Sequence, residues 1–86
     1  MDVASTWTDG LNNALHPLGH LLSGEQATDI FPALIDEAAL GKLRSVTDAQ
    51  IAEMVDRANA WCDSDDIRAE HIRAAIEYTL RDWEEA

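Results

Sequence analysis

Cysteine and lysine are almost absent from this chain. Cys62 and Lys42 are the only ones among the 86 residues. A single cysteine allows neither a disulfide within the chain nor a cysteine cage for a metal ion. Lysine and arginine together number six, and nucleic-acid binding requires clustered basic side chains. The sequence therefore predicts no direct binding of nucleic acid.

Long apolar runs are also missing. No stretch of the sequence is long enough and apolar enough to span a bilayer. Residues 1–6 lack the basic and apolar segments of a secretory signal. We therefore expect a soluble, cytoplasmic protein that does not bind membranes.

Catalytic signatures are not found either. The chain contains no glycine-rich phosphate loop and no nucleophile elbow. Cys62 falls on an apolar helix face without an adjacent cation, which is typical of a small buried side chain. The only Asp-Ser pair, Asp63-Ser64, is followed by Asp65 and not by the leucine of acyl carrier proteins. We expect no enzymatic activity and no cofactor.

Three histidines raise the possibility of a metal site. His16 and His20 are four residues apart, a spacing that can bind zinc on a continuous helix. Pro17 lies between them and is expected to break that helix. A third ligand would have to be His71 or a carboxylate brought close by folding. We therefore predict no metal site.

The acidic stretch after residue 62 begins like a calcium-binding loop. Asp63, Asp65 and Asp66 supply carboxylates at the start. An EF-hand needs glycine at the sixth position and an acidic residue at the twelfth. These positions hold Arg68 and Ala74. A turn that caps helices is the better interpretation.

Helical periodicity dominates the second half. Thr47 and Gln50 form a capping box before a predicted helix over 48–62, in which Glu53 and Arg57 are spaced to form an ion pair. A second helix is predicted over about 69–83, after a turn over 63–66. The apolar stripes of the two helices are Ile51, Met54, Val55, Ala58, Trp61 and Cys62, and Ile72, Ala75, Ile76, Leu80 and Trp83. The two helices are expected to form a hairpin.

The first half is less regular because it contains both prolines. Leucines 11, 15, 18 and 22 keep helical spacing, with Thr8 as a possible cap. The helix is expected to end near Leu15 and to restart at Pro17.

A further short helix is predicted after residue 22. Ser23 and Gln26 form a second capping box. The apolar face that follows, Ala27, Phe31, Leu34, Ile35 and Ala38, is expected to kink or restart at Pro32 and to end at Gly41.

These patterns predict one all-α domain over residues 1–86. It is expected to be a bundle of four to five short helices with a helical hairpin at the C-terminal end. No segment shows the alternating pattern of a strand.

Charge is the unusual property of the composition. Seventeen acidic residues against six basic ones give a net charge of −11, which attracts basic proteins and repels nucleic acid. In size and charge the chain resembles small acidic inhibitors of phages and mobile elements, some of which mimic DNA, although no shared motif accompanies this similarity. The predicted function is a non-enzymatic module that binds a basic protein. The predicted partner-binding residues are Asp63, Asp65, Asp66, Glu70, Glu77, Asp82, Trp83, Glu84 and Glu85.

Two alternatives stay open at this point. The acidity could serve solubility or adaptation to a salty host. The chain could also be a structural or adaptor protein that forms a homodimer through the leucine face over 11–22, because small helical domains often gain core by pairing. Trp7 and Trp83 are further interface candidates, since tryptophan is enriched at binding hot spots.

Overall fold

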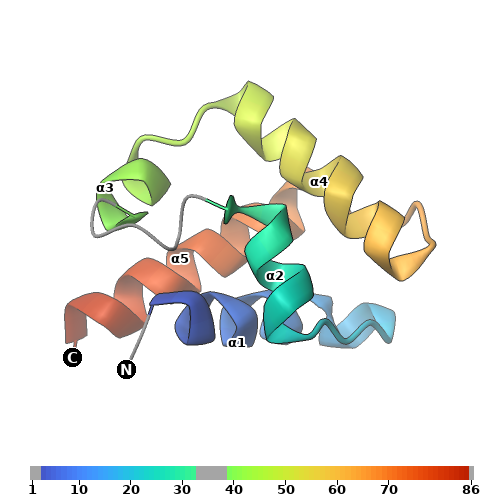
Figure 1. Cartoon of the computed structure of the whole chain (residues 1–86), viewed down its shortest axis with the longest axis horizontal. Helices are drawn as coiled ribbons and strands as arrows, with labels where there is room; N and C mark the ends of the chain where they lie inside the picture. Colours follow the sequence, from blue (N-terminus) through green and yellow to red (C-terminus); the bar gives the residue numbers. More distant parts are fainter. Residues whose placement is uncertain (1–2, 33–38, 86) are drawn as a thin grey trace.

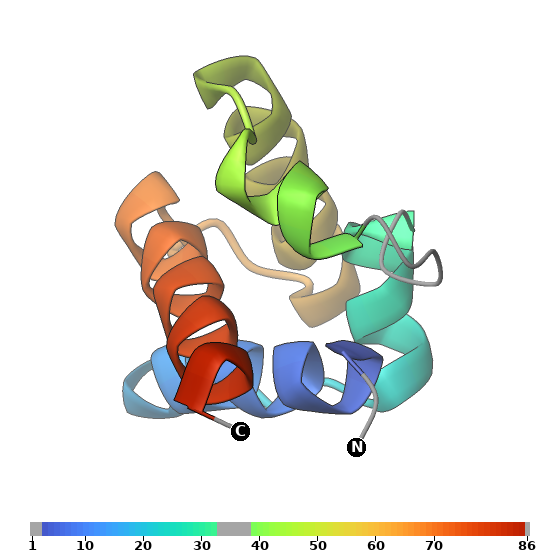
Figure 2. The same cartoon turned by 90° about the vertical axis from the view of Figure 1, so that its left-hand side faces the viewer.

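A computed structural model describes residues 3–32 and 39–85 of the chain. All of the regular structure in this part is helical, as the sequence predicts. The elements are α1 (Val3–Leu15), the 3₁₀ helix η1 (His16–Leu18), α2 (Gly24–Ile30), α3 (Ala39–Arg44), α4 (Asp48–Cys62) and α5 (Ala69–Glu85). Helices α1, α2, α4 and α5 surround a common centre (Figures 1 and 2).

The two capping boxes form as predicted. The backbone N–H of Gln50 donates to Thr47 Oγ1 at 3.2 Å, and the backbone N–H of Thr47 donates to Gln50 Oε1 at 2.8 Å. Ser23 and Gln26 make the same reciprocal pair, at 3.2 and 2.9 Å. Helices α4 and α2 begin directly after these caps because each box satisfies two backbone N–H groups that would otherwise lack partners.

The start of the first helix differs from the prediction. Helix α1 begins at Val3, so Thr8 lies inside it and is not its cap. The Thr8 hydroxyl donates to the carbonyl of Ala4 at 2.8 Å. This bond lets a threonine sit in a helix interior without leaving its hydroxyl unsatisfied. The predicted break is confirmed: α1 ends at Leu15 and η1, which contains Pro17, follows it.

The prediction that Gly41 ends a helix is wrong. It lies within α3 and does not end a helix. A Cβ at Gly41 would meet nothing within 4 Å, so the glycine is tolerated there without any packing requirement. Helix α2 ends at Ile30, just before Pro32. The predicted apolar positions Leu34, Ile35 and Ala38 lie outside the described residues.

Trp7 lies at the centre of the core. Its side chain has no exposed surface, its indole N–H donates to the carbonyl of Ala27 at 2.8 Å, and its ring centroid is 6.2 Å from that of Phe31. The prediction that Trp7 lies in an interface is therefore wrong. Helix α1 extends further toward the N-terminus than expected, which places Trp7 one turn before Leu11 on the buried face.

The leucine face over 11–22 is also used inside the molecule. Leu11 and Leu15 are completely buried, and Leu22 is only 3% exposed. These three side chains therefore pack in the chain's own core, and of the predicted face only Leu18 is partly exposed.

Helix α4 buries only part of its predicted stripe. Ile51, Met54 and Ala58 are in the core, whereas Trp61 is 47% exposed. The Trp61 indole N–H donates to Asp29 Oδ2 at 2.8 Å. This surface bond to α2 holds the ring outside the core, so the prediction of a buried Trp61 is wrong. The side chain of Trp83, in α5, lies outside the described residues.

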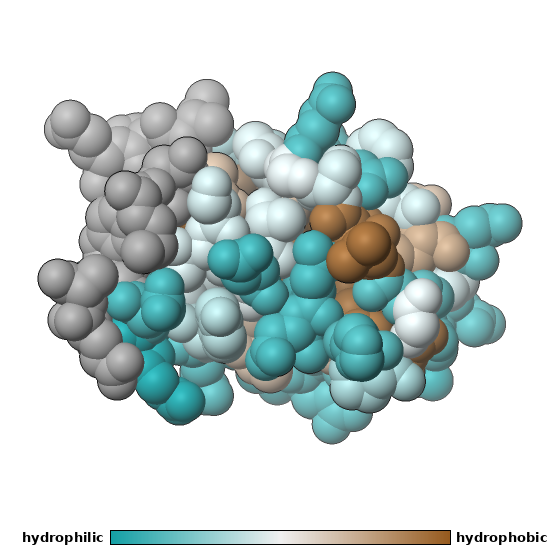
Figure 3. Space-filling view, turned by 90° about the horizontal axis from the view of Figure 1, so that it is seen from below, coloured by the Kyte–Doolittle hydropathy of each residue, from teal (hydrophilic) through white to brown (hydrophobic). Residues whose placement is uncertain are grey.

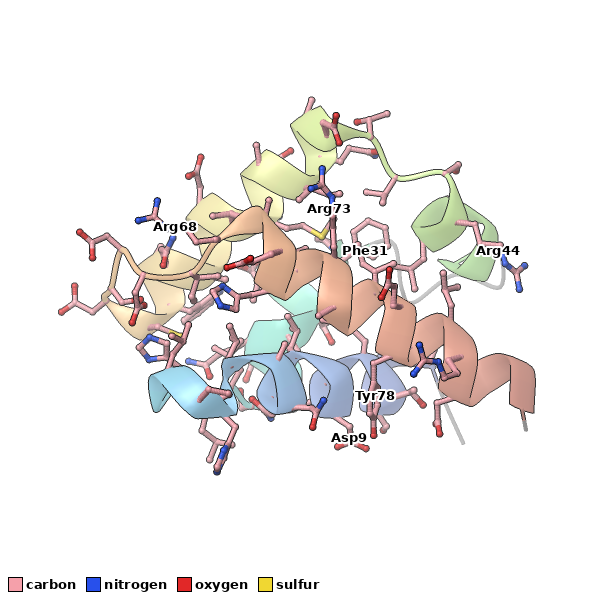
Figure 4. All side chains as sticks on the ribbon, turned by 180° about the vertical axis from the view of Figure 1, so that it is seen from behind. Asp9, Phe31, Arg44, Arg68, Arg73 and Tyr78 are labelled. Carbon is pink, nitrogen blue, oxygen red and sulfur yellow. The ribbon has the colours of Figure 1, made fainter. Side chains whose placement is uncertain are left out.

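Helices α1 and α5 approach each other most closely at Gly10. A Cβ at this position would lie 3.0 Å from the carbonyl oxygen of Ala75. It would also lie 3.1 Å from Thr79 Oγ1 and 3.1 Å from Tyr78 Cδ1, and Figure 4 shows Tyr78 against α1. Thr79 is completely buried and its hydroxyl donates to Ala75 O at 2.8 Å. The crossing therefore depends on a residue without a side chain.

We expect Gly10→Ala to lower the free energy of unfolding by about 1 kcal/mol, because overpacking costs about 1–3 kcal/mol and exceeds the gain in helix propensity of about 1 kcal/mol. Gly41→Ala is the matched control. It also replaces a helical glycine but meets open space, so it should be neutral or stabilising by about 0.5–1 kcal/mol. Urea unfolding followed by circular dichroism measures both. A Gly10→Ala variant as stable as the parent would contradict the close crossing.

Candidate functional site

The structure separates the predicted partner-binding residues into two groups. Residues 63–66 form the turn between α4 and α5 at one end of the long axis, and α5 ends at the other end (Figure 1). The molecule is 32 Å long in this direction. Glu70, Glu77 and Asp82 are exposed along α5, while the side chains of Trp83, Glu84 and Glu85 lie outside the described residues. The nine residues thus do not make one compact site.

Asn59 builds the turn between α4 and α5. Its Oδ1 accepts from the Ile67 N–H at 3.1 Å, and its Nδ2 donates to the Ile67 carbonyl at 3.2 Å. The Ser64 hydroxyl also donates to Asn59 Oδ1, at 3.2 Å. Ile67 is buried at the far end of the turn. One amide side chain therefore fixes the path of the backbone over residues 63–67.

Asp63 ends α4 in a left-handed conformation, with φ of +50°. Its N–H donates to the Ala60 carbonyl at 3.4 Å, and the Ser64 N–H donates to the Asn59 carbonyl at 3.0 Å. Aspartate is one of the few residues other than glycine that adopts this conformation readily. The αL residue turns the chain sharply and leaves the Asp63 side chain exposed.

We expect Asn59→Ala to destabilise the fold by about 1–2 kcal/mol, because it removes the partners of both Ile67 backbone groups. In Asn59→Ala, amide hydrogen exchange should become faster over residues 64–67 than in the parent chain, with a smaller change in α1. Asn13→Ala is the control, since Asn13 is an exposed residue of α1 and alanine favours helix. Equal stability of the two variants would show that the amide does not hold the turn.

An acidic surface forms around this turn. Asp56, Asp63 and Asp65 are exposed and, with Asn59, Ala60 and Ser64, line an open depression of about 550 Å³. We call Asp56, Asp63 and Asp65 the acidic turn surface. No ion pair within the described residues involves any of the three. Asp56 was not among the residues predicted from the sequence, although it lies on α4 two helical turns before the C-cap Asp63.

Asp66 has a different role from its neighbours. Its Oδ1 lies 2.9 Å from Nε2 of His20, so the carboxylate is directed at the segment that follows η1. This hydrogen bond holds the pKa of Asp66 below its ordinary value, and a further bond from Ser64 acts in the same direction. Asp66 therefore joins the segment that contains His20 to the turn, while its side chain remains 46% exposed, so its contact with a partner stays a prediction.

The depressed pKa of Asp66 has a defined consequence for stability. The ionised carboxylate stabilises the folded chain above the ordinary carboxyl pKa of 3.8, and this stabilisation is lost as the pH falls through the lower folded-state pKa. We expect His20→Ala to raise the pKa of Asp66 toward 3.8, as measured by carboxyl-carbon NMR during a pH titration. His16→Ala is the control, because His16 is exposed in η1. An unchanged Asp66 pKa in His20→Ala would show that the histidine does not hold it down.

The three histidines do not assemble into a metal site. His20 is bonded to Asp66, and His71 Nδ1 accepts from the backbone N–H of Arg68 at 2.9 Å at the start of α5. Among the side chains that the structure describes, no three His, Cys, Asp or Glu residues come together in a group that could hold a metal ion. The two hydrogen bonds give His20 and His71 structural partners.

Cys62 is half-buried beside the turn. Burial raises the pKa of its thiol, and the negative charge of Asp66 raises it further. The thiol therefore stays protonated at neutral pH, which is the opposite of what an activated nucleophile needs.

Two arginines form ion pairs with carboxylates of α4 among the described residues. Arg57 pairs with Glu53 at 3.0 Å, as predicted, and Arg73 pairs with Asp48 at 2.8 Å. Asp48 begins the fifteen-residue α4, so it lies about 20 Å from the turn at 1.5 Å per residue. Arg68 is the nearest cation to the turn in the sequence and is exposed (Figure 4). Asp56 and the three aspartates of residues 63–66 outnumber Arg57 and Arg68, the arginines nearest to them in the sequence, by four to two.

Within the described residues, no helix is both long enough and apolar enough to cross a membrane. Comparison with known proteins gives no relatives: no family model, no curated protein and no solved structure matches the chain.

Proposed function

We propose that this chain is a non-enzymatic protein-binding module whose acidic surface occupies a basic, nucleic-acid-binding protein in place of nucleic acid. The observation that carries the proposal is the acidic turn surface. Asp56, Asp63 and Asp65 are exposed around an open depression without ion-pair partners in the described part of the chain. Carboxylates arranged in this way can accept hydrogen bonds from lysine and arginine as phosphate oxygens do.

Preorganisation supports this assignment. Asn59 fixes the turn through three hydrogen bonds, and the His20–Asp66 bond ties the turn to a second segment. Less conformational freedom would be lost when a partner binds a turn that is already ordered. The carboxylates would therefore meet a cationic surface in the positions that they already hold.

The remaining acidic residues would act at longer range. Glu70, Glu77 and Asp82 are exposed on α5, and Glu84 and Glu85 add two more charges to its end. A net charge of −11 accelerates encounter with a basic partner. This effect is screened over about 8 Å at physiological salt, so it would assist association more than it would determine the final contacts. In this proposal Trp83 would supply apolar contact at that end of α5.

The proposal is tested by capture followed by competition. The tagged protein is incubated with nuclease-treated lysate of the source cells, and captured proteins are eluted with rising salt and identified by mass spectrometry. We expect a basic nucleic-acid-binding protein that is released at high salt and that loses a fluorescent oligonucleotide when the purified chain is added.

Matched charge variants locate the contact. Asp56→Asn, Asp63→Asn and Asp65→Asn together should raise the concentration needed for displacement by at least tenfold and leave the helical circular dichroism unchanged. A control with Asp9→Asn, Glu77→Gln and Asp82→Asn removes the same number of exposed charges elsewhere and should have a much smaller effect. Failure to capture any basic protein, or equal activity of the parent and both variants, would refute the proposed function.

A further inference from the structure

A cleft opens between α3, α4 and α5, and it shares no residue with the acidic turn surface. Its volume is about 200 Å³. Most of its walls are apolar: Leu43, Val46, Ile51, Ile76 and Leu80. The other lining residues are charged: Arg44, Arg73 and Glu77. The cleft therefore combines apolar walls with side chains that can recognise a charge.

The apolar walls are held in place by the core. Leu43, Ile51 and Ile76 are buried, with 1%, 5% and 6% of their surface exposed. Val46 and Leu80 are half-buried and pack against the core from outside. A ligand in the cleft would cover the exposed parts of these two side chains, and removing apolar surface from water favours binding.

The cleft is distinct from the apolar surface of the lower face of the molecule. Seen from below, the molecule is mostly hydrophilic, with one compact apolar patch toward the end where the turn over residues 63–66 lies (Figures 1 and 3). The cleft lies toward the other end, beside α3 (Figure 1). A ligand of the cleft would therefore leave that patch uncovered.

Cations are concentrated around this cleft. The chain has only six lysine and arginine residues. Arg44 and Arg73 line the cleft, and two more, Lys42 and Arg81, directly adjoin wall residues in the sequence. Among the described residues that line it, Glu77 carries the one negative charge against two arginines. In a chain with a net charge of −11, this local excess of positive charge favours an anionic ligand.

Arg73 shows how a carboxylate would be held at the cleft. Its Nη2 donates to Asp48 Oδ1 at 2.8 Å. The two side chains are 53% and 92% exposed, and an ion pair as exposed as this contributes little to stability. A ligand carboxylate could therefore replace that of Asp48 at small cost. Figure 4 shows Arg44 well apart from Arg73, so one carboxylate would be bound by Arg73 alone.

We propose that this cleft binds a short aliphatic carboxylate. The carboxylate would accept hydrogen bonds from Arg73, and the tail would lie between Val46 and Leu80. A water molecule takes about 30 Å³ in the liquid, so a cleft of about 200 Å³ holds about six or seven groups of that size. Pockets for drug-sized ligands begin at about 300 Å³, so the volume selects a small molecule. This site lies outside the acidic turn surface and does not depend on the proposed function.

Titration with acids of different length tests the apolar part of the site. Butyrate, hexanoate and octanoate are added in turn to the full chain, and affinities and contacted residues are measured from amide chemical shifts. We expect hexanoate to bind about tenfold more tightly than butyrate, because two further methylenes enter the cleft. Octanoate should gain little more, because the cleft is then full. The shifts should centre on residues 43–46, 51 and 73–80.

Ligands of equal length test the charge. Hexylammonium is attracted by the net charge of the chain but would meet Arg44 and Arg73 at the cleft. Hexanoate should therefore bind there more tightly than hexanol, and hexanol more tightly than hexylammonium. The reverse order would overturn the proposal.

Variants connect the binding to the cleft. Arg73→Gln should weaken hexanoate by about fivefold and leave hexanol unchanged. Arg57→Gln is the matched control, since Arg57 also pairs with a carboxylate of α4 but does not line the cleft. Val46→Thr keeps the shape and adds a hydroxyl, so it should weaken both ligands. Unchanged thermal unfolding confirms that the variants are folded.

Two results would refute the site. One is equal affinity for butyrate and hexanoate, or an affinity that keeps rising steeply with chain length, with shifts spread over the whole surface. The other is unchanged hexanoate binding in both Arg73→Gln and Val46→Thr. Asp63→Asn with Asp65→Asn should not affect hexanoate, so failure of this site would leave the proposed function as it stands.

Discussion

Helices α1 and α5 cross at Gly10, and the core is assembled around this contact. The hypothetical Cβ at Gly10 would lie 3.0 Å from a backbone carbonyl oxygen of α5, so a side chain there would require its neighbours to shift by a few tenths of an ångström. The crossing brings α1 and its buried Trp7 to the centre of the molecule, where the indole bonds to Ala27 of α2. Helix α5 also packs on α4. Helix α1 thus contacts α5 closely at Gly10 and α2 through Trp7.

Two asparagines fix the backbone of segments that lie outside the helices. Asn12 pairs with both backbone groups of Leu22, and Asn59 pairs with both backbone groups of Ile67. Each side-chain amide satisfies both the N–H and the C=O of a residue outside the helices, as the backbone of a neighbouring strand would do. The side chains of these two residues, Leu22 and Ile67, are buried. The bond between His20 and Asp66 then joins the two segments. The segment over residues 20–22 and the turn over residues 63–67 are thus fixed relative to each other.

Charge is distributed unevenly over this frame. Arg57 and Arg73 pair with carboxylates on α4 away from the turn, whereas Asp56 and Asp63 face an open depression. Carboxylates left without cationic partners at an ordered site retain their full attraction for an external cation. In the proposed function, the net negative charge would attract a basic partner at long range, and the acidic turn surface would be one of the surfaces that contact it.

The sequence by itself determined the all-α class, the capping boxes and the bounds of α4, because these depend on local hydrogen bonds and on periodicity along one helix. It placed residues 63–66 in a turn for the same reason. Only the tertiary structure decided that Trp7 is buried, that Trp61 is exposed against Asp29, and that Asp66 is bonded to His20, forty-six residues away. These outcomes depend on which helix face meets which neighbour. Periodicity identifies an apolar face but does not state what will cover it.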